Sequence, residues 1–389
     1  MEYSISSQNV ADYINNSNLY RVEQISIEKT TSVAGKNFNL LLELSDKNSI
    51  LVKQERQYSK GQTLGEFSNE WQIHRLLQEF TELDSIRLFF PEILHFDVDN
   101  SVIVFKYQKN YQDLAEFYAK ERLYPVHIAE QIGKISAEIH KATEKKEYEN
   151  FWRLNQKDDL NHRVSELTRD LERITPEIFG IVTDDGLKFY SLYQRYDSLR
   201  LAIMELLNSL QSRCLIHGDL KLNNILLHEK WQKEYSNLRG QENPLVRLID
   251  WERVTWGDPA FDLGAVIASY LQIWLGSLIV SKGKDIKASI DAATTPLKLI
   301  QPSITALIDT YLSNFPRILD SYPDFLLRVI QYAGFSLIMQ IQAMIQRKQH
   351  FSNNTICMLQ VAKSLLCQPE QSIPTIFGTT KSEIIRSRQ

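Results

Sequence analysis

Cysteine is scarce in this chain. The three that occur, Cys214, Cys357 and Cys367, have no metal-ligand spacing. A chain of 389 residues with so few thiols carries no disulfide framework, and it favours a reducing compartment over secretion. We therefore expect a cytoplasmic protein.

A signal peptide and a strong excess of charge are also missing. The opening stretch MEYSISSQNVADYINN is too polar for a signal peptide. With 44 Lys and Arg against 48 Asp and Glu, the net charge of −4 provides no general attraction to nucleic acid or to an anionic membrane. We expect neither as a partner, and the sequence leaves the oligomeric state open.

Only one stretch comes close to the length of a membrane span. It is Leu263–Val280, LGAVIASYLQIWLGSLIV. Ser269, Gln272 and two glycines interrupt it, and it begins directly after Asp258 and Asp262. We expect it to form a buried central helix and not a transmembrane segment.

The most informative part of the chain is Leu215–Glu252, where two short apolar runs each end in polar residues. The first run leads into His217, Asp219 and Asn224, spaced as HGDxxxxN, and the second ends in Asp250. A carboxylate, an amide and a second carboxylate after a strand are the groups that phosphoryl transfer requires. The first orients an attacking hydroxyl and accepts its proton, and the other two bind Mg²⁺. The competing interpretation makes Asp219 a turn residue and Asp250 a strand-end cap. It does not explain why Asn224 lies five residues after Asp219.

This segment also resembles a known family. HGDLKLNN followed by IDWERVTWGDPAFDLG is similar to the Brenner-type signature of the aminoglycoside phosphotransferase and choline kinase superfamily. Protein kinases carry the same chemistry in H-R-D-L-x-x-x-N and D-F-G. The resemblance implies an α+β, bilobal protein-kinase-like fold, with a small antiparallel N-terminal sheet, one main helix and a larger, mostly helical second lobe. It also implies ATP and Mg²⁺ as cofactors and a hydroxyl group as the phosphate acceptor.

On this resemblance, residues 1–107 form the N-lobe, which positions the nucleotide. Residues 108–389 form the C-lobe, with the catalytic loop, the metal site and the acceptor-binding helices. Two insertions, about 144–188 and 281–300, have no counterpart in the kinase core, and the first could shape the acceptor site or be a surface excursion.

Periodicity predicts further elements of the second lobe. One amphipathic helix is expected over Tyr190–Leu210, and Glu229–Pro244 is expected to be a surface hairpin. Three helical patterns, at about 301–315, 322–347 and 353–367, precede a tail.

A turn near the N-terminus could contact the nucleotide. Ser32–Asn37 contains Gly35 and Asn37, and its placement resembles the nucleotide-positioning loop of the family. Its backbone N–H groups could meet phosphate oxygens, although it is not a Walker A motif and most such loops are ordinary hairpin turns.

A lysine on the third expected strand is the second nucleotide candidate. Lys53 follows a run of apolar residues, where kinase-like folds place a lysine that contacts the α- and β-phosphates. Glu70, in a helical stretch, is expected to pair with Lys53 and hold it. Glu66, one turn away, could take the same role.

Other residues receive supporting roles from the resemblance. His217 is expected to pack under the catalytic loop, and Asp262 to brace that loop through backbone N–H groups. Lys221 matches the DLK of protein kinases, where the lysine meets the γ-phosphate, although an exposed lysine with no role is an equal alternative. Glu252 is a candidate acceptor contact. His140 is interpreted as a helix-terminal residue near the C-end dipole, with a contact to the catalytic loop as the alternative.

The acceptor is less well defined than the donor. From residue 301 to the end, eight Lys and Arg stand against five Asp and Glu, which argues against a polycationic aminoglycoside. A quaternary ammonium acceptor would need an aromatic cage, for which Trp251, Trp256, Trp274 and Tyr332 are candidates unless they lie in the core. A Ser or Thr of a peptide remains the third possibility.

A different class of function is a catalytically silent, kinase-like scaffold that binds nucleotide or a partner. Such scaffolds usually lack one of the residues at the positions of Lys53, Asp219, Asn224 and Asp250. All four are present here, which favours an active phosphotransferase.

Overall fold

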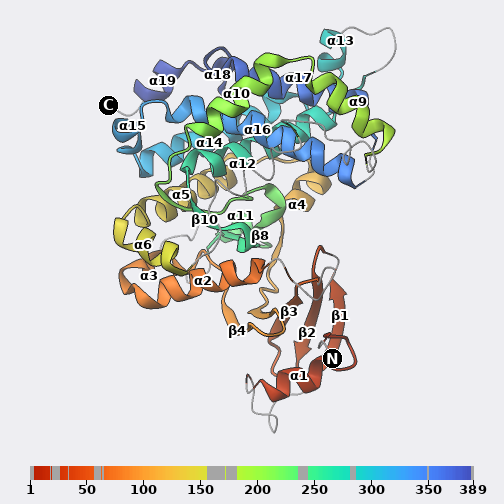
Figure 1. The fold of residues 1–389 in the computed structure, drawn as a ribbon, viewed down its shortest axis with the longest axis vertical. Helices are drawn as coiled ribbons and strands as arrows, with labels where there is room; N and C mark the ends of the chain where they lie inside the picture. Colours follow the sequence, from red (N-terminus) through yellow and green to blue (C-terminus); the bar gives the residue numbers. More distant parts are fainter. Residues whose placement is uncertain are drawn as a thin grey trace. The chain divides into compact units, whose positions relative to one another are not determined.

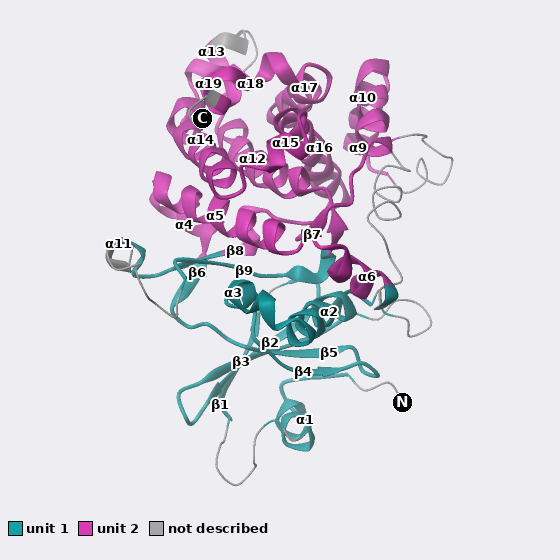
Figure 2. Ribbon diagram, turned by 90° about the vertical axis from the view of Figure 1, so that its left-hand side faces the viewer, with its two compact units in different colours: residues 1–112, 154–156, 226–254 teal, residues 113–153, 157–225, 255–389 magenta. Residues whose placement is uncertain are grey.

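The computed structural model describes residues 4–17, 19, 27–33, 35–56, 63, 65–155, 171, 182–234, 244–280, 286–347 and 350–386 (Figure 1). The chain divides into two compact units (Figure 2). The first contains residues 1–112, 154–156 and 226–254, and the second contains residues 113–153, 157–225 and 255–389.

The first unit is built on a five-stranded sheet of order β1-β2-β3-β5-β4, in which all neighbours are antiparallel. Its strands are β1 (Ile27–Val33), β2 (Phe38–Leu44), β3 (Ser49–Gln54), β4 (Ile93–Asp97) and β5 (Val102–Lys106). Side chains along a strand point alternately to the two faces of a sheet. Each face of this sheet therefore needs its own cover.

Helices cover the two faces. Ile50 and Val52 of β3 pack in a cluster with α1 (Val10–Asn16). On the other face, Leu51 packs in a cluster with Phe67 and Trp71 of α2 (Glu66–Glu79). Lys53 follows Leu51 at a spacing of two, so the alternation puts it on the α2 face.

The first unit also contains shorter elements. They are a 3₁₀ turn η1 (Thr81–Leu83), α3 (Asp84–Arg87), α11 (Trp231–Glu234) and a 3₁₀ turn η4 (Trp251–Arg253). A three-stranded sheet of order β6-β8-β9 joins β6 (Tyr111–Asp113), β8 (Ile225–His228) and β9 (Val246–Leu248).

The second unit is almost entirely helical. Its helices are α4 (Leu114–Glu121), α5 (Val126–Ala142), α6 (Lys146–Asn155), α9 (Asp184–Tyr193), α10 (Asp197–Asn208), α12 (Pro259–Gly276), α13 (Ile286–Asp291), α14 (Leu297–Asn314), α15 (Ile318–Ser321), α16 (Phe325–Gln346), α17 (Asn353–Cys367), α18 (Pro369–Phe377) and α19 (Lys381–Arg386). Two strands, β7 (Cys214–Ile216) and β10 (Thr255–Gly257), and the 3₁₀ turn η2 (Leu222–Asn224) complete it. The predicted α+β class, with a small antiparallel sheet and a large helical part, is confirmed.

Glycine allows two helix pairs of the second unit to approach closely. A Cβ on Gly133 of α5 would collide with the backbone carbonyl of Leu307 in α14. A Cβ on Gly264 of α12 would lie 2.6 Å from the Cβ of Tyr332 in α16. Any larger residue at either position would push the helices apart.

The start of α12 is fixed by a buried ion pair. Asp258 caps the helix by accepting from the N–H of Ala260, and Pro259 occupies its first turn. The other carboxylate oxygen of Asp258 accepts from Arg328 Nη2 at 2.9 Å and from the Tyr322 hydroxyl at 2.7 Å.

Within the described part of the chain, α12 and every other helix is too short or too polar to cross a membrane.

Three local predictions need correction. Tyr190–Leu210 is not one helix, because α9 ends at Tyr193 and α10 begins at Asp197. The tail after residue 367 forms α18 and α19, and α18 buries Ile373, Ile376 and Phe377 in spite of its internal Pro374. The third correction concerns the predicted surface hairpin Glu229–Pro244. Its residues 231–234 form the helix α11 instead of a strand.

Some expectations fall on segments that the structure does not describe. Residues 235–243 of the predicted hairpin lie outside the described residues. The same holds for 156–170 and 172–181 in the first insertion and for 281–285 in the second. The described parts of the insertions contribute α6, the start of α9, α13 and the start of α14.

Candidate active site

The catalytic-loop motif follows a buried strand of the second unit. β7 pairs antiparallel with β10, with Ile216 opposite Thr255. All three residues of β7 are buried, and the N–H of Leu215 donates to the hydroxyl of Thr143 at 3.1 Å. The apolar run predicted from the sequence therefore delivers His217 and Asp219 at a fixed strand end.

Asp262 holds the first turn of this loop. Its carboxylate accepts from the backbone N–H of His217 at 2.7 Å and of Gly218 at 3.0 Å. Gly218 has a φ of +76°, a conformation that glycine adopts without strain. The structure thus places Asp262 where the resemblance implied, against the loop backbone.

His140 stands behind Asp262. Its Nε2 lies 3.3 Å from the Asp262 carboxylate, and its Nδ1 lies 3.1 Å from the Tyr311 hydroxyl. The side chain is buried, so the preferred interpretation, a helix-terminal histidine near a dipole, is incomplete. His140 is connected to the catalytic loop through the Asp262 carboxylate, which is close to the alternative interpretation, a contact to that loop.

The Asp219 carboxylate has two polar neighbours within the loop. Lys221 Nζ donates to its Oδ2 at 2.8 Å. The amide of Asn224 donates to the Asp219 carbonyl at 2.8 Å and lies 3.4 Å from its Oδ2. His217 Nδ1 accepts from the Asp219 N–H at 3.3 Å, which is a structural contact and not one to the carboxylate.

The orientation of Asn224 matters for metal binding. The amide nitrogen of Asn224 donates to Asp219, so the amide oxygen is not used in that contact. No other described residue donates a hydrogen bond to that oxygen. An amide oxygen without a protein donor is the kind of ligand that Mg²⁺ takes.

In the first unit, Lys53 forms an ion pair with Asp250. Its Nζ lies 2.5 Å from Asp250 Oδ1. Burial opposes the charge on Lys53, but the carboxylates of Asp250 and Glu70 outweigh it and raise its pKa. Asp250 itself has a φ of +65°, an uncommon left-handed conformation for a non-glycine residue, which is often found at functional sites.

The expected ion pair of Lys53 with Glu70 is therefore not the one observed. Glu70 Oε1 instead accepts from the backbone N–H of Trp251 at 3.3 Å. Burial raises the pKa of Glu70 to about 7, against the opposing attraction of Lys53. Glu70 still attracts the Lys53 ammonium, but the ion pair of Lys53 is with Asp250.

The turn before β2 is held by carboxylates. Lys36 pairs with Glu66 and lies 3.8 Å from Glu252, and Asn37 Nδ2 lies 3.4 Å from the same Glu252. A Cβ on Gly35 would collide with the Asn39 side chain, so this position needs glycine unless that side chain moves.

Glu252 and Glu66 thus have contacts that the sequence reasoning missed. Glu66 pairs with Lys36 and not with Lys53. Burial, followed by the nearby Glu66 and Asp250 carboxylates, raises the pKa of Glu252. Its described contacts are with the turn and with Asn69, which donates to its carbonyl at 3.1 Å. A role for Glu252 toward the acceptor stays a prediction.

Charged side chains from distant segments could only be paired once the fold was known. Arg328 with Asp258 and Lys36 with Glu66 are examples.

Across the described residues, no group of three or more His, Cys, Asp and Glu side chains is arranged to hold a metal ion.

The model of the phosphotransferase enzyme family, APH, matches residues 56–283. No curated protein matches the chain.

Two solved structures have a similar fold. A choline/ethanolamine kinase family protein from Mesorhizobium loti is 12% identical, with a TM-score of 0.51, and the match covers 96% of this chain and 99% of that chain. The aminoglycoside phosphotransferase APH(2″)-IIIa, in complex with GDP and kanamycin, is 13% identical, with a TM-score of 0.51, and the match covers 92% and 98%. These likenesses confirm the kinase-like fold.

Proposed function

This chain belongs to the phosphotransferase enzyme family, and we propose that it transfers the γ-phosphate of ATP to a hydroxyl group of its acceptor. The observation that carries the proposal is the catalytic loop. There a buried carboxylate, Asp262, fixes the backbone that presents Asp219, and Lys221 and Asn224 orient the Asp219 side chain. We further propose that residues 1–107 form the N-lobe and residues 108–389 the C-lobe, whereas the first compact unit also contains residues 226–254.

Asp219 is the proposed catalytic base. Its Oδ2 accepts from Lys221 and lies near the Asn224 amide, and its side chain remains 28% exposed. A hydroxyl acceptor that donates to this carboxylate would be oriented for attack and would lose its proton there. Lys221 pairs with Asp219 in the absence of acceptor, and we propose that it approaches the γ-phosphate when nucleotide is bound.

Lys53 is the proposed phosphate contact in the first unit. Its pairing with Asp250 keeps the ammonium charged and largely buried. Glu70 on α2 attracts the same ammonium. The turn with Gly35 and Asn37 is proposed to lie over the nucleotide phosphates, as the resemblance implies.

Asn224 and Asp250 are the proposed ligands of Mg²⁺. Both offer oxygen, the ligand atom that this ion prefers, and the Asn224 amide oxygen has no donor among the described residues. When bound, the ion neutralises charge on the β- and γ-phosphates. Asp250 would exchange Lys53 for the ion, and Lys53 would be released toward phosphate.

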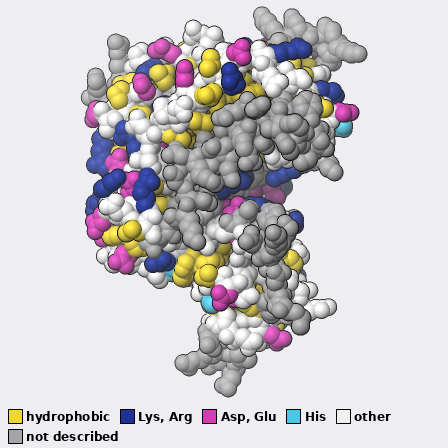
Figure 3. Space-filling view, viewed as in Figure 1, with side chains coloured by type: hydrophobic (Ala, Val, Ile, Leu, Met, Phe, Trp, Pro, Cys, Tyr) yellow, Lys and Arg dark blue, Asp and Glu magenta, His cyan; other side chains and the backbone are white. Residues whose placement is uncertain are grey.

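The charge argument about the acceptor loses its force in the structure. Two of the eight basic residues after position 301 are neutralised by carboxylates from other segments: Arg317 by Glu144, at 2.7 Å, and Arg328 by Asp258. That leaves six basic residues against five acidic ones. On the face shown in Figure 3, acidic side chains also lie among the basic ones. The charge of this segment therefore does not exclude a polycationic acceptor.

The proposed aromatic cage for a quaternary ammonium is also unsupported. Trp251, Trp256, Trp274 and Tyr332 are all buried, with at most 7% of each residue exposed. Tyr332 hydrogen-bonds with Arg328 and Asp258 in the interior of the second unit. These residues belong to the core, as the alternative held.

The acceptor is proposed to be a hydroxyl-bearing small molecule or a Ser or Thr of a peptide. The test is a screen with γ-labelled ATP and Mg²⁺ against amino alcohols, aminoglycosides and hydroxyl-rich peptides, including peptides encoded beside the gene. Label transferred to an acceptor by the parent and not by Asp219→Asn supports the proposal. Tight ATP binding without transfer to any acceptor or to water would instead support a kinase-like scaffold.

A further inference from the structure

Three buried polar side chains connect helix α14 to the catalytic loop inside the second unit. The Tyr311 hydroxyl lies 3.1 Å from His140 Nδ1, and His140 Nε2 lies 3.3 Å from Asp262 Oδ2. The same Oδ2 accepts from the backbone N–H of His217 at 2.7 Å. Tyr311, His140 and Asp262 are each at most 2% exposed. The three side chains therefore reach the loop from the interior, and none of them is open to substrate.

Packing fixes the two rings of this series. Tyr311 stacks on Phe325 of α16, with ring centroids 5.4 Å apart and an angle of 16° between the planes. The rings of His140 and Tyr311 meet edge to face, with centroids 5.7 Å apart. A phenylalanine at position 311 keeps the ring and its stacking, so the hydroxyl can be tested separately from the packing.

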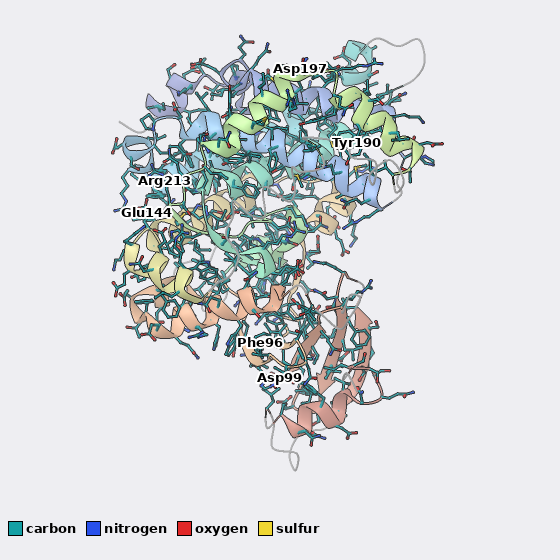
Figure 4. All side chains as sticks on the ribbon, viewed as in Figure 1. Phe96, Asp99, Glu144, Tyr190, Asp197 and Arg213 are labelled. Carbon is teal, nitrogen blue, oxygen red and sulfur yellow. The ribbon has the colours of Figure 1, made fainter. Side chains whose placement is uncertain are left out.

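The end of α5, which carries His140, is joined to the strand that leads into the loop. The hydroxyl of Thr143, directly after α5, accepts from the N–H of Leu215 in β7 at 3.1 Å. Figure 4 labels Glu144 and Arg213, the residues that follow Thr143 and precede β7. The backbone that carries His140 is therefore held beside the loop, and what remains to be fixed is the orientation of its ring.

The direction of the two hydrogen bonds follows from the groups involved. Burial raises the pKa of the Tyr311 hydroxyl well above its usual value, so this hydroxyl keeps its proton. A buried hydroxyl needs an acceptor for that proton, and among the described residues His140 Nδ1 is the one within reach. An imidazole whose Nδ1 accepts carries its own proton on Nε2, and here Nε2 faces the Asp262 carboxylate.

We propose that Tyr311 is a positioning residue of the catalytic loop, an assignment that rests on the proposed function of Asp219 as the base. The Tyr311 hydroxyl donates to His140 Nδ1 and holds the ring so that Nε2–H donates to Asp262. Asp262 in turn fixes the backbone that presents Asp219. Without the hydroxyl, the buried Nδ1 has no donor, which disfavours this orientation of the ring. Asp262 then loses one of its three donors.

Tyr311→Phe tests the proposal, with Tyr270→Phe as the matched control. The Tyr270 hydroxyl is also buried and bonds with that of Tyr118 at 2.9 Å, so each variant loses one buried hydroxyl in the second unit. The assay is the release of phosphate to water from γ-labelled ATP with Mg²⁺, which needs no identified acceptor.

We expect kcat to fall about tenfold in Tyr311→Phe while the KM for ATP stays within about twofold of the parent, because the base is displaced and the nucleotide contacts are not. The control should keep both constants. Equal losses of kcat in the two variants, or no loss in Tyr311→Phe, overturn the proposal.

A double variant tests whether Tyr311 acts through His140. His140→Gln keeps an amide that can donate to Asp262 but has no ring nitrogen for Tyr311. In that background, Tyr311→Phe should lower kcat by less than about twofold. A further loss of about tenfold would give Tyr311 an effect independent of His140, and would overturn the proposed series.

NMR of the protein labelled with ¹⁵N-histidine tests the same contacts without any activity. The His140 signals are those that disappear in His140→Gln. Its proton should lie on Nε2 in the parent and in Tyr270→Phe, and should exchange with water about tenfold faster in Tyr311→Phe. A proton on Nδ1 alone in the parent, or unchanged exchange in Tyr311→Phe, overturns the proposal. If the parent releases no phosphate from ATP, the proposed function fails, and the exchange measurement still decides whether Tyr311 holds His140.

Discussion

Replacing Asp262 should destabilise the second unit through the catalytic loop. The residue is 2% exposed, and its carboxylate accepts from the N–H groups of His217, at 2.7 Å, and Gly218, at 3.0 Å. His140 Nε2 lies 3.3 Å from the same carboxylate. Asp262→Ala leaves these two backbone donors without an acceptor in the interior.

The magnitude follows from those contacts. A hydrogen bond to a charged group contributes about 1.5–3 kcal/mol, so two of them predict a loss of about 3–6 kcal/mol in the free energy of unfolding. Asp262→Asn keeps one acceptor oxygen and should lose about half as much. Phosphoryl transfer should fall in both variants, because the loop that presents Asp219 is no longer fixed.

Urea denaturation monitored by circular dichroism measures this loss. Asp320→Ala is the matched control, because Asp320 is exposed and has no hydrogen bond or ion pair with a described residue. The control should stay within about 0.5 kcal/mol of the parent. A loss for Asp262→Ala that is no larger than the control's would refute the role of Asp262 as the support of the loop.

Lys53→Ala should weaken ATP binding and turnover together, and combining it with Glu70→Ala should cost less than the sum of the two single changes if the residues act as a unit. If the two single losses in ATP affinity add up to the loss in the double variant, Lys53 and Glu70 act independently. Asn224→Ala and Asp250→Ala should each remove the increase in nucleotide affinity that Mg²⁺ produces, because each lacks a proposed metal ligand. Titrations with and without Mg²⁺ decide this, and an intact increase in Asp250→Ala would put the metal elsewhere.

The local parts of the site could be predicted from the sequence. The alternation of apolar residues in β3 places Lys53 on the face covered by α2, and a buried run places His217 at the end of β7. Pro259 after Asp258 indicates a helix start, which is where α12 begins. These predictions depend on neighbours along the chain, so periodicity and capping suffice.

Pairing between distant residues could not be predicted in the same way. Lys53 is 197 positions from Asp250, and Arg328 is 70 positions from Asp258. Which carboxylate receives each cation depends on the fold, since Lys53 pairs with Asp250 and Glu70 accepts from the Trp251 N–H. A count of charges in one segment fails for the same reason, because Glu144 and Asp258 neutralise arginines of another segment.

The central claim is that Asp219 is the base of a phosphotransferase, and Asp219→Asn tests it most directly. The asparagine keeps the size of the side chain but cannot accept the acceptor's proton. Single-turnover transfer from γ-labelled ATP should fall by about 10²–10⁴, while the Kd of ATP with Mg²⁺ changes little. Transfer within a few-fold of the parent, in a variant that binds ATP normally, would contradict the account.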